Sequence, residues 1–313
     1  MWYSGKNRQI QNQPDFELAS GAIGVATSND GIKWEPLAGD ETAGAVLAPN
    51  DDWWAFDTLH VGVGDVHVMS NQVVKNSMGL YWMYYFGGDE SEPTLGGSNG
   101  TAPPGSRMCI GVALSNDGIH WGRVEGEYAS GAILEPREGE VFVGWPQVVQ
   151  ASSSPDLWYM YFHVLCKETR RFKVGCAQSK NCVEWQRLDA YIFEPALSDG
   201  AFDAGGVSAR CVLRDGDEWL MYYEAINLMG THSIGLARSR DGIGWTRTDK
   251  PVLEPSADPS SWDAKAVSRP WVVPCGDGSA MLYYVGRSVS GVQAIGAAQS
   301  DGANWASFSK CTN

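Results

Sequence analysis

Short apolar runs alternate with stretches rich in Gly, Asp, Asn and Pro along the whole chain. The runs contain mainly β-branched and aromatic residues, as in WMYYFGG at Trp82, WYMYFHV at Trp158 and WLMYYEA at Trp219. Runs of this length and composition, bounded by turn-forming residues, predict β-strands. We therefore expect an all-β protein with almost no helix.

One phrase closed by tryptophan occurs five times. The copies are IGVATSNDGIKW ending at Trp34, IGVALSNDGIHW ending at Trp121, VGCAQSKNCVEW ending at Trp185, IGLARSRDGIGW ending at Trp245 and IGAAQSDGANW ending at Trp305. Successive tryptophans are 87, 64, 60 and 60 residues apart. A unit of this length that cannot bury its own apolar face must stack on its neighbours, so the repeat predicts an array or a propeller.

Each repeat contains further apolar runs around the phrase. Valine-ending and aromatic runs precede it, and a run such as VLAP at Val46 or VLEP at Val252 follows it. This gives about four antiparallel strands per unit, which is the content of a propeller blade. We expect residues 1–313 to form one domain, a five-bladed β-propeller. Because Met1 falls directly in the second strand of the first unit, we expect that blade to lack its innermost strand.

The S-x-D-G-x-x-W element within the phrase has a structural explanation. Asp-Gly between two strand patterns supplies the positive φ angles of a tight hairpin, and the tryptophan can pack the blade beneath it. Because every repeat carries a version of the element, we attribute it to the fold and not to a binding site.

Composition restricts the function classes. The net charge of −14 argues against nucleic acid or an anionic membrane surface as a partner, and no long apolar segment predicts a membrane span. The seven cysteines form no C-x-x-C pair and no zinc spacing, so we expect free thiols, no metal and no cofactor. A monomer is expected. The compartment is left open, because a targeting peptide could have stood before Met1.

In a repeat protein, shared residues are credited to the fold and unshared polar residues to function. The entries to the innermost strands read FDTLHVGVGDV, GEVFVGWPQVV, FDAGGVSARCV and WDAKAVSRPWV. Asp57, Asp203 and Asp263 share one position, where tying a loop is the leading interpretation. A second register matches Gln72–Val74 to Gln147–Val149 and equates Asp65 with Glu140.

Ten polar or aromatic residues at the strand entries and strand ends have no counterpart in the other repeats. They are His60, Asp65, His67, Trp145, Arg210, Lys265 and Arg269 at the entries, and His163, Glu224 and Arg287 at the ends of the second strands. Propeller topology brings both sets to one face, where 87–107, the longest loop, is a lid candidate. A carboxylate pair with histidines and arginines suits acid/base hydrolysis of a sugar bond. Acidic residues at strand ends also commonly cap loops or pair with arginine.

The tryptophan-closed repeats, the M-Y-Y second strands and the FD-x3-V strand entries resemble the five-bladed propeller superfamily of arabinanase, levansucrase and invertase, which includes glycoside hydrolase families 32, 43 and 68. This resemblance implies three acidic residues at a central funnel. Asp65 would be the general base and Glu224 the general acid, with Glu140 or Asp203 as the third. The chain departs from the family in two respects: no Asp-Pro stands at the strand entries, and the WxNDPNG signature of invertases is missing.

Two hypotheses about function follow. The first is an inverting glycoside hydrolase that acts on a carbohydrate in the funnel, with His60, His67, Trp145, His163, Arg210, Arg269 and Arg287 as substrate-binding residues. The second is a divergent propeller without this activity, which binds or transforms another small molecule in the same funnel. Convergence of His60, His67 and His163 on a metal or a non-sugar ligand would favour the second, whereas an exposed Trp145 would favour the first.

Overall fold

The computed structural model describes residues 1–5, 21–69, 80–95, 100–151, 157–302 and 305–311. The chain forms two compact units, each described below by itself. The first contains Met1–Arg170 and Ala177–Arg187, and the second contains Arg171–Cys176 and Leu188–Asn313.

The described residues form 19 β-strands and a single turn of 3-10 helix at Thr42–Gly44, with no α-helix among them. The prediction of an all-β fold is therefore confirmed. In chain order up to the unit boundary the strands are β1 (Trp2–Gly5), β2 (Ala22–Thr27), β3 (Glu35–Leu37), β4 (His60–Met69), β5 (Leu80–Gly88), β6 (Met108–Ser115), β7 (Gly122–Val124), β8 (Glu140–Gln150), β9 (Trp158–Cys166), β10 (Phe172–Ser179) and β11 (Gln186–Arg187).

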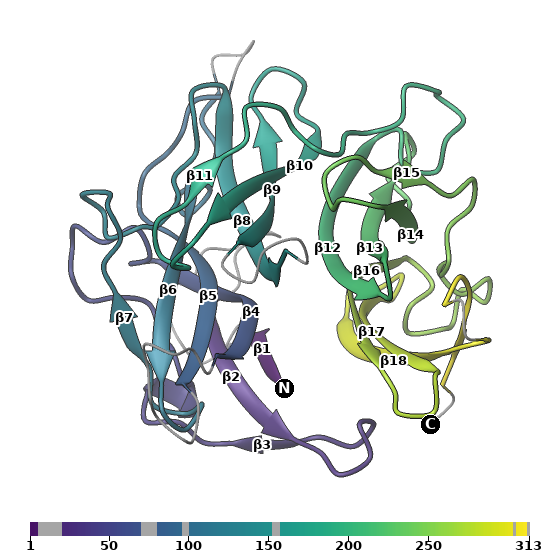
Figure 1. Cartoon of the computed structure of the whole chain (residues 1–313), viewed down its shortest axis with the longest axis horizontal. Coiled ribbons are helices and arrows are strands. Elements are labelled where there is room, and N and C mark those ends of the chain that lie inside the picture. The colour runs from purple at the N-terminus through teal and green to yellow at the C-terminus, as the bar shows by residue number, and fades with distance from the viewer. Residues whose placement is uncertain (6–20, 70–79, 96–99, 152–156, 303–304, 312–313) are drawn as a thin grey trace. The chain divides into compact units, whose positions relative to one another are not determined.

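These strands form three sheets, whose order follows the chain (Figure 1). The described part of the first sheet has three strands, β1-β2-β3, and the second has the order β4-β5-β6-β7. The third has the order β11-β10-β9-β8, and the boundary between the units runs through β10. The strand pairings described within them are antiparallel, as in a meander of hairpins.

The second unit continues with β12 (Gly206–Asp215), β13 (Glu218–Ile226), β14 (His232–Ser239), β15 (Thr246–Arg247), β16 (Ala266–Pro274), β17 (Ala280–Arg287), β18 (Gln293–Ser300) and β19 (Phe308–Lys310). Its eight strands are joined into one sheet by a single parallel pair, His232 with Ala266. Apart from that pair, β12 to β15 and β16 to β19 are two four-stranded antiparallel meanders.

The fourth strand of each meander lies elsewhere than expected. In β3, β7, β11 and β15 the last strand begins directly after the repeated tryptophan, and β19 begins three residues after Trp305; none of them begins at a run such as VLEP. Those runs form single β-bridges to the third strand, such as Ile23 with Leu47 and Ile234 with Leu253. The tight hairpin returns the chain to the sheet at once, and the proline ending each run has no N–H for a longer ladder.

The glycine of the repeated I-G-x-A sequence makes room for a tyrosine of the second strand. A Cβ on Gly111 would lie 2.6 Å from the Tyr85 ring, and one on Gly235 would lie 2.5 Å from the Tyr223 ring. Both tyrosines are fully buried. The glycine therefore serves close packing between neighbouring strands, which explains why it recurs with the phrase.

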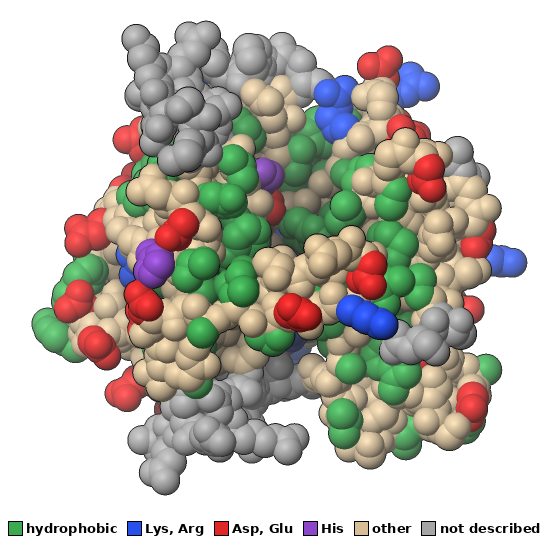
Figure 2. All heavy atoms as spheres, turned by 90° about the horizontal axis from the view of Figure 1, so that it is seen from below, with side chains coloured by type: hydrophobic (Ala, Val, Ile, Leu, Met, Phe, Trp, Pro, Cys, Tyr) green, Lys and Arg blue, Asp and Glu red, His purple; other side chains and the backbone are tan. Residues whose placement is uncertain are grey.

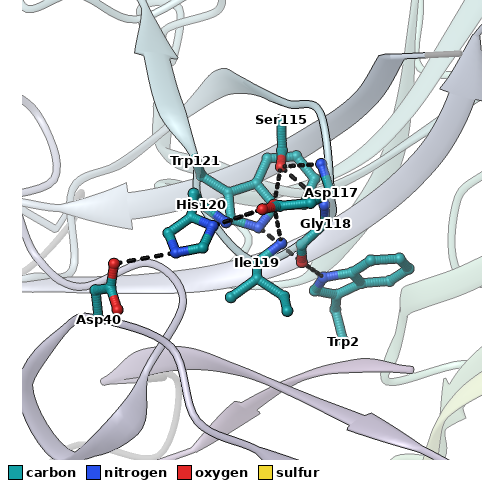
Figure 3. Close-up of polar contacts among 8 residues, drawn as sticks. All are labelled: Trp2, Asp40, Ser115, Asp117, Gly118, Ile119, His120 and Trp121. Atoms are coloured by element: carbon teal, nitrogen blue, oxygen red, sulfur yellow. Dashed lines mark hydrogen bonds and ion pairs between the residues drawn. The ribbon is translucent and has the colours of Figure 1, made fainter. Parts of the chain in front are cut away.

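The S-x-D-G-x-x-W element closes the hairpin between the third and fourth strands (Figure 3). Ser115 Oγ accepts hydrogen bonds from the N–H groups of Asp117 and Gly118. Asp117 Oδ1 accepts hydrogen bonds from the N–H groups of Ile119 and His120. Trp121 Nε1 donates to the Gly118 carbonyl at 3.1 Å, and Gly118 has φ +78°. The structural interpretation of the element is confirmed, because its polar atoms satisfy the backbone of the turn.

The same hairpin is linked to another loop by a histidine (Figure 3). His120 lies 2.5 Å from Asp117 and 3.0 Å from Asp40, and these carboxylates raise its pKa. All three side chains are largely exposed, so this ion pair contributes little to stability.

Acidic side chains are scattered over the face shown in Figure 2, where few Lys and Arg side chains accompany them. This agrees with the net charge of −14. No helix among the described residues is long and apolar enough to cross a membrane. The seven cysteines are all free thiols in the structure.

Candidate functional site

The recurring aspartates before the innermost strands are held by a tyrosine and a cation. Asp203 accepts the Tyr223 hydroxyl at 2.9 Å and pairs with Arg247 at 2.6 Å. Asp263 likewise accepts the Tyr284 hydroxyl and pairs with Lys310. In the first unit, Asp57 pairs with Arg123 at 2.8 Å and bonds to Tyr85. In each case the cation comes from the fourth strand, so these aspartates tie the strand entry to the outer edge of the same sheet.

Glu140 has the same role with altered chemistry. Its two oxygens bind both terminal nitrogens of Arg187 on β11, at 2.6 and 2.9 Å, and one of them also accepts the Arg137 N–H. Phe162 occupies the position of the tyrosine, and the Arg187 guanidinium lies over its ring. The longer carboxylate thus reaches the arginine where no hydroxyl is present. The geometry gives both Glu140 and Asp203, predicted as possible third carboxylates, a structural function.

The first strand of each four-stranded meander (β4, β8, β12 and β16) carries an irregularity near the middle. The register shifts between Val63 and Asp65 in β4, and equivalent shifts occur in β8, β12 and β16. A bulge turns the side chain that follows it and often lies beside an active site. Trp145 and Arg269 have φ values of 49° and 50° in these bulges, and both precede proline. This backbone is strained for a residue with a side chain, and such strain is concentrated at functional positions.

Asp65 follows the bulge of β4 and lies opposite Tyr84 of β5 in the backbone register. Its Oδ2 lies 2.7 Å from Nε2 of His67 and accepts the N–H of Val148 at 2.9 Å. This placement supports the first register of the strand entries, while Gln72–Val74 of the alternative register lie outside the described residues. A carboxylate lining an open funnel would face solvent, whereas Asp65 is buried, with 3% of its surface exposed. It is buried because its carboxylate joins β4 to β8.

His67 is half-buried beside this carboxylate, with an edge-to-face contact to Trp158. Burial alone would lower its pKa, but the charge of Asp65 and the hydrogen bond between them outweigh burial, so the pKa of His67 is raised. His67 beside Asp65 therefore keeps its imidazolium proton to a higher pH than an isolated histidine in water would.

Glu224 ends the buried part of β13 and has a similar partner in the second unit. Its Oε1 lies 2.5 Å from Nδ1 of His232, the first residue of β14. Burial would raise the pKa of Glu224, but the His232 hydrogen bond and charge, the positive charge of Arg269 and the Arg269 N–H together lower it. Glu224 is buried, with 8% of its surface exposed. It lies beside His232 of β14 and Arg269 of β16.

The two carboxylate–histidine pairs give stability opposite pH dependences. His67 has a raised pKa when folded, so its contribution is full below about 6.5 and is lost as pH rises through the folded value. Glu224 has a lowered pKa, so its contribution is present above about 4.3 and is lost as pH falls through the folded value. We would measure the free energy of unfolding in urea at a series of pH values. We expect His67→Gln to weaken its dependence on pH on the alkaline side, and Glu224→Gln to weaken it on the acid side. Wild-type curvature in both variants would contradict these assignments.

Trp145 lies between aromatic side chains of the first unit. Its ring centroid is 4.2 Å from that of Phe86 and 4.2 Å from that of His163, and the His163 ring is stacked at 20°. His163 is buried, and Trp145 is half-buried. The indole is therefore not the openly exposed platform that a sugar-binding interpretation needs, although its remaining surface is available.

His60 anchors the loop that was predicted as a lid. It is fully buried, and its Nε2 lies 2.9 Å from the Gly105 carbonyl. The described part of the loop is closed by a bridge between Thr94 and Thr101, while residues 96–99 lie outside the described residues. These contacts tie the base of the loop to β4, so His60 has a structural role here.

Three arginines of the second unit lie on β12, β16 and β17, in the same sheet as Glu224 of β13. Arg210 is buried and pairs with Tyr223 across the bulge of β12. Arg287 lies opposite Ala266 in the backbone register, and Ala266 lies opposite His232. The three residues therefore form a row across the sheet. Arg269 contributes charge and its N–H to Glu224. Among the described residues no group of three His, Cys, Asp or Glu side chains is arranged to hold a metal ion.

His232 was missed by the sequence reasoning. It lies eight residues after Glu224, and its pairing with Ile226 places it diagonally opposite Glu224 across the β13–β14 hairpin. The hairpin register, once derived from the flanking apolar pattern, would have brought the two together.

No family model matches the chain. An uncharacterized protein, MT1551 of Mycobacterium tuberculosis, is 25% identical over 166 residues, which are 52% of this chain and 52% of that protein. The chain thus spans about half the length of the curated relative it matches.

Solved structures share the fold over most of the chain. A glycoside hydrolase matches with a TM-score of 0.65 and 18% identity, over 89% of this chain and 78% of the other. A thermostable family-43 glycoside hydrolase matches with a TM-score of 0.64 and 12% identity, over 94% and 86%. An N-acetylgalactosamine deacetylase from F. plautii, in complex with blood group B trisaccharide, matches with a TM-score of 0.62 and 16% identity. The match covers 92% of this chain and 83% of the other. At these identities the likeness shows a common all-β fold.

Proposed function

We propose that the chain is an inverting glycoside hydrolase built as a single five-bladed β-propeller, whose first blade has three strands. The five antiparallel meanders and the fold shared with solved glycoside hydrolases support this architecture. In a propeller the innermost strands line the central channel, and small-molecule sites are concave regions where a few polar groups converge. Asp65 and Glu224 stand on the innermost strand or at the end of the second strand of their meanders, the positions that border this channel.

The partners of the buried carboxylates carry the proposal. Asp57, Glu140, Asp203 and Asp263 are each neutralised by an arginine or lysine, whose charge is fixed at physiological pH. Asp65 and Glu224 pair instead with histidines, which can take up or release a proton near neutral pH. Among the buried carboxylates of the described residues, these two are the ones whose partners can change protonation during a reaction, as acid/base hydrolysis requires.

In the proposed reaction Asp65 accepts a proton from the attacking water, and its hydrogen bonds from His67 and Val148 fix the orientation of the carboxylate. The Glu224–His232 pair donates the proton to the leaving oxygen. Because these groups share a 2.5 Å hydrogen bond and the pKa of Glu224 is lowered, the proton delivered to the leaving oxygen is the one that this hydrogen bond shares. Inversion requires about 6.5–9.5 Å between the carboxyl groups, so that water fits beside the sugar.

The test is release of sugar from arabinan, fructan, xylan and a panel of aryl glycosides, followed by NMR of the first product formed. We expect turnover of at least one neutral glycoside and an initial product with inverted anomeric configuration. A retained configuration would overturn the inverting mechanism. If no glycoside is turned over while a non-sugar ligand binds, the proposal fails and the divergent-propeller hypothesis replaces it.

A further inference from the structure

Two adjacent tryptophans remain outside the repeated architecture. Trp53 is 91% exposed and Trp54 is 39% exposed, and both lie in the loop before the innermost strand β4. The tryptophans that close the repeats each donate their indole N–H to a carbonyl; they are Trp34, Trp121, Trp185, Trp245 and Trp305. Within the described structure neither Trp53 nor Trp54 donates such a bond. Both therefore present an aromatic surface and an available donor.

The loop that carries these tryptophans is fixed in place. The Ala55 N–H donates to the Asp52 carbonyl at 2.9 Å, and the next N–H, from Phe56, donates to the Ser130 carbonyl. Ala55 and Phe56 are buried beneath the loop. Two exposed indoles on an anchored loop lose little conformational entropy when a ligand binds.

The indole of Trp54 is held against a neighbouring turn. A Cβ on Gly131 would lie 3.3 Å from the Trp54 ring, so the indole covers this turn. The Gly131 N–H donates to the Tyr128 carbonyl, and Ser130 of the same turn bonds to Glu135, which pairs with Arg107. Trp53 and Trp54 are called the Trp53 platform below.

We propose that the Trp53 platform binds a neutral polysaccharide chain, at a site separate from the one that contains Asp65. Aromatic faces stack on the C–H faces of sugar rings, and the free indole N–H groups can donate to sugar oxygens. Exposed carboxylates lie directly before the platform, at Asp51 and Asp52, and just before the turn that Trp54 covers, at Glu125 and Glu127. Carboxylates accept hydrogen bonds from hydroxyls, which a neutral sugar supplies in number.

The same carboxylates argue against other occupants of this surface. A polyanion such as nucleic acid or a polyuronate would be repelled. A second copy of the chain, docked with the same patch on both sides, would bring like charges together. The inference rests on the carbohydrate-directed part of the proposed function but does not need bond cleavage by this chain.

The test is native gel electrophoresis in gels that contain soluble arabinan, levan or xylan. We expect one of these polysaccharides to retard the wild-type chain, and the Trp53→Ala/Trp54→Ala double variant to bind at least about tenfold more weakly. Leu197→Ala and Met229→Ala are matched controls, because both side chains are apolar and almost fully exposed but not aromatic. Both controls should migrate like wild type.

Hydrolysis of a small aryl glycoside separates this inference from the proposed function. The double variant should retain wild-type turnover on such a substrate. Retardation that depends on Trp53 and Trp54 supports the platform even if no glycoside is cleaved. Three results would overturn it: no retardation by any of the three polysaccharides, retardation unchanged in the double variant, or a concentration-dependent dimer of the wild type that the double variant abolishes.

Discussion

Asp65→Asn and Glu224→Gln are each expected to reduce turnover of a confirmed glycoside substrate by at least about a hundredfold, the usual scale for removing a positioned acid or base. The asparagine oxygen can still accept the Val148 N–H, and its amide remains beside His67, so the change removes mainly charge. In the Glu224 variant His232 loses the anion that holds its proton. The measurement is kcat/KM at pH values between 5 and 8.

The leaving group distinguishes the two proposed roles. A phenol of low pKa departs without protonation. The fall in kcat/KM caused by Glu224→Gln should therefore be much smaller for activated aryl glycosides than for a natural linkage. Asp65→Asn should lose similarly on both, because water attacks in either case. Asp263→Asn is the matched control, since it makes the same substitution at a buried aspartate paired with Lys310 and should leave kcat near wild type. Full activity in both test variants would remove these residues from the mechanism.

Replacing one member of the Glu140–Arg187 pair is expected to lower the free energy of unfolding by about 3–5 kcal/mol, the usual result of leaving a buried charge unpaired. The side chains are 2% and 6% exposed, so solvent does little to screen the remaining charge. We expect this loss for Glu140→Ala and for Arg187→Met in urea denaturation. Turnover per folded molecule should stay near wild type.

The double variant Glu140→Ala/Arg187→Met provides the internal check. Since neither charge is left unpaired, its destabilisation should be well below the sum of the two single changes, as expected for residues in direct contact. Additive losses would show that the pair does not act as a unit. A hundredfold loss of kcat in Glu140→Ala, with the fold intact, would return Glu140 to the catalytic set.

The sequence pattern predicted the strands that bury side chains, because β-branched and aromatic runs reflect burial directly. It did not locate the fourth strands, which in β11 and β15 have only two residues and too few positions to show alternation. The role of the recurring aspartates could be predicted from their recurrence. The partner of Glu140 could not, because Arg187 lies 47 residues away in a strand with no pattern of its own.

Asp65 and Glu224 could be proposed from the sequence, but their environment could not be predicted from it. Asp65 and Glu224 were found because they break the repeat. Their burial and their histidine partners depend on the hairpin register and on the bulges, which place Asp65 against Val148. Neither feature has a local sequence signal, since a bulge can be moved one residue without changing the apolar pattern.

The change from aspartate and tyrosine to Glu140 and Phe162 limits how the repeats can be exchanged. In the third meander the added methylene of the acid compensates for the lost hydroxyl, and Arg187 binds both carboxylate oxygens. A chimera that takes the strand entry from one repeat and the second strand from another would combine a short acid with Phe162, or a long acid with a tyrosine. Recombination within this protein should therefore succeed only when the acid, the aromatic residue and the cation are inherited together.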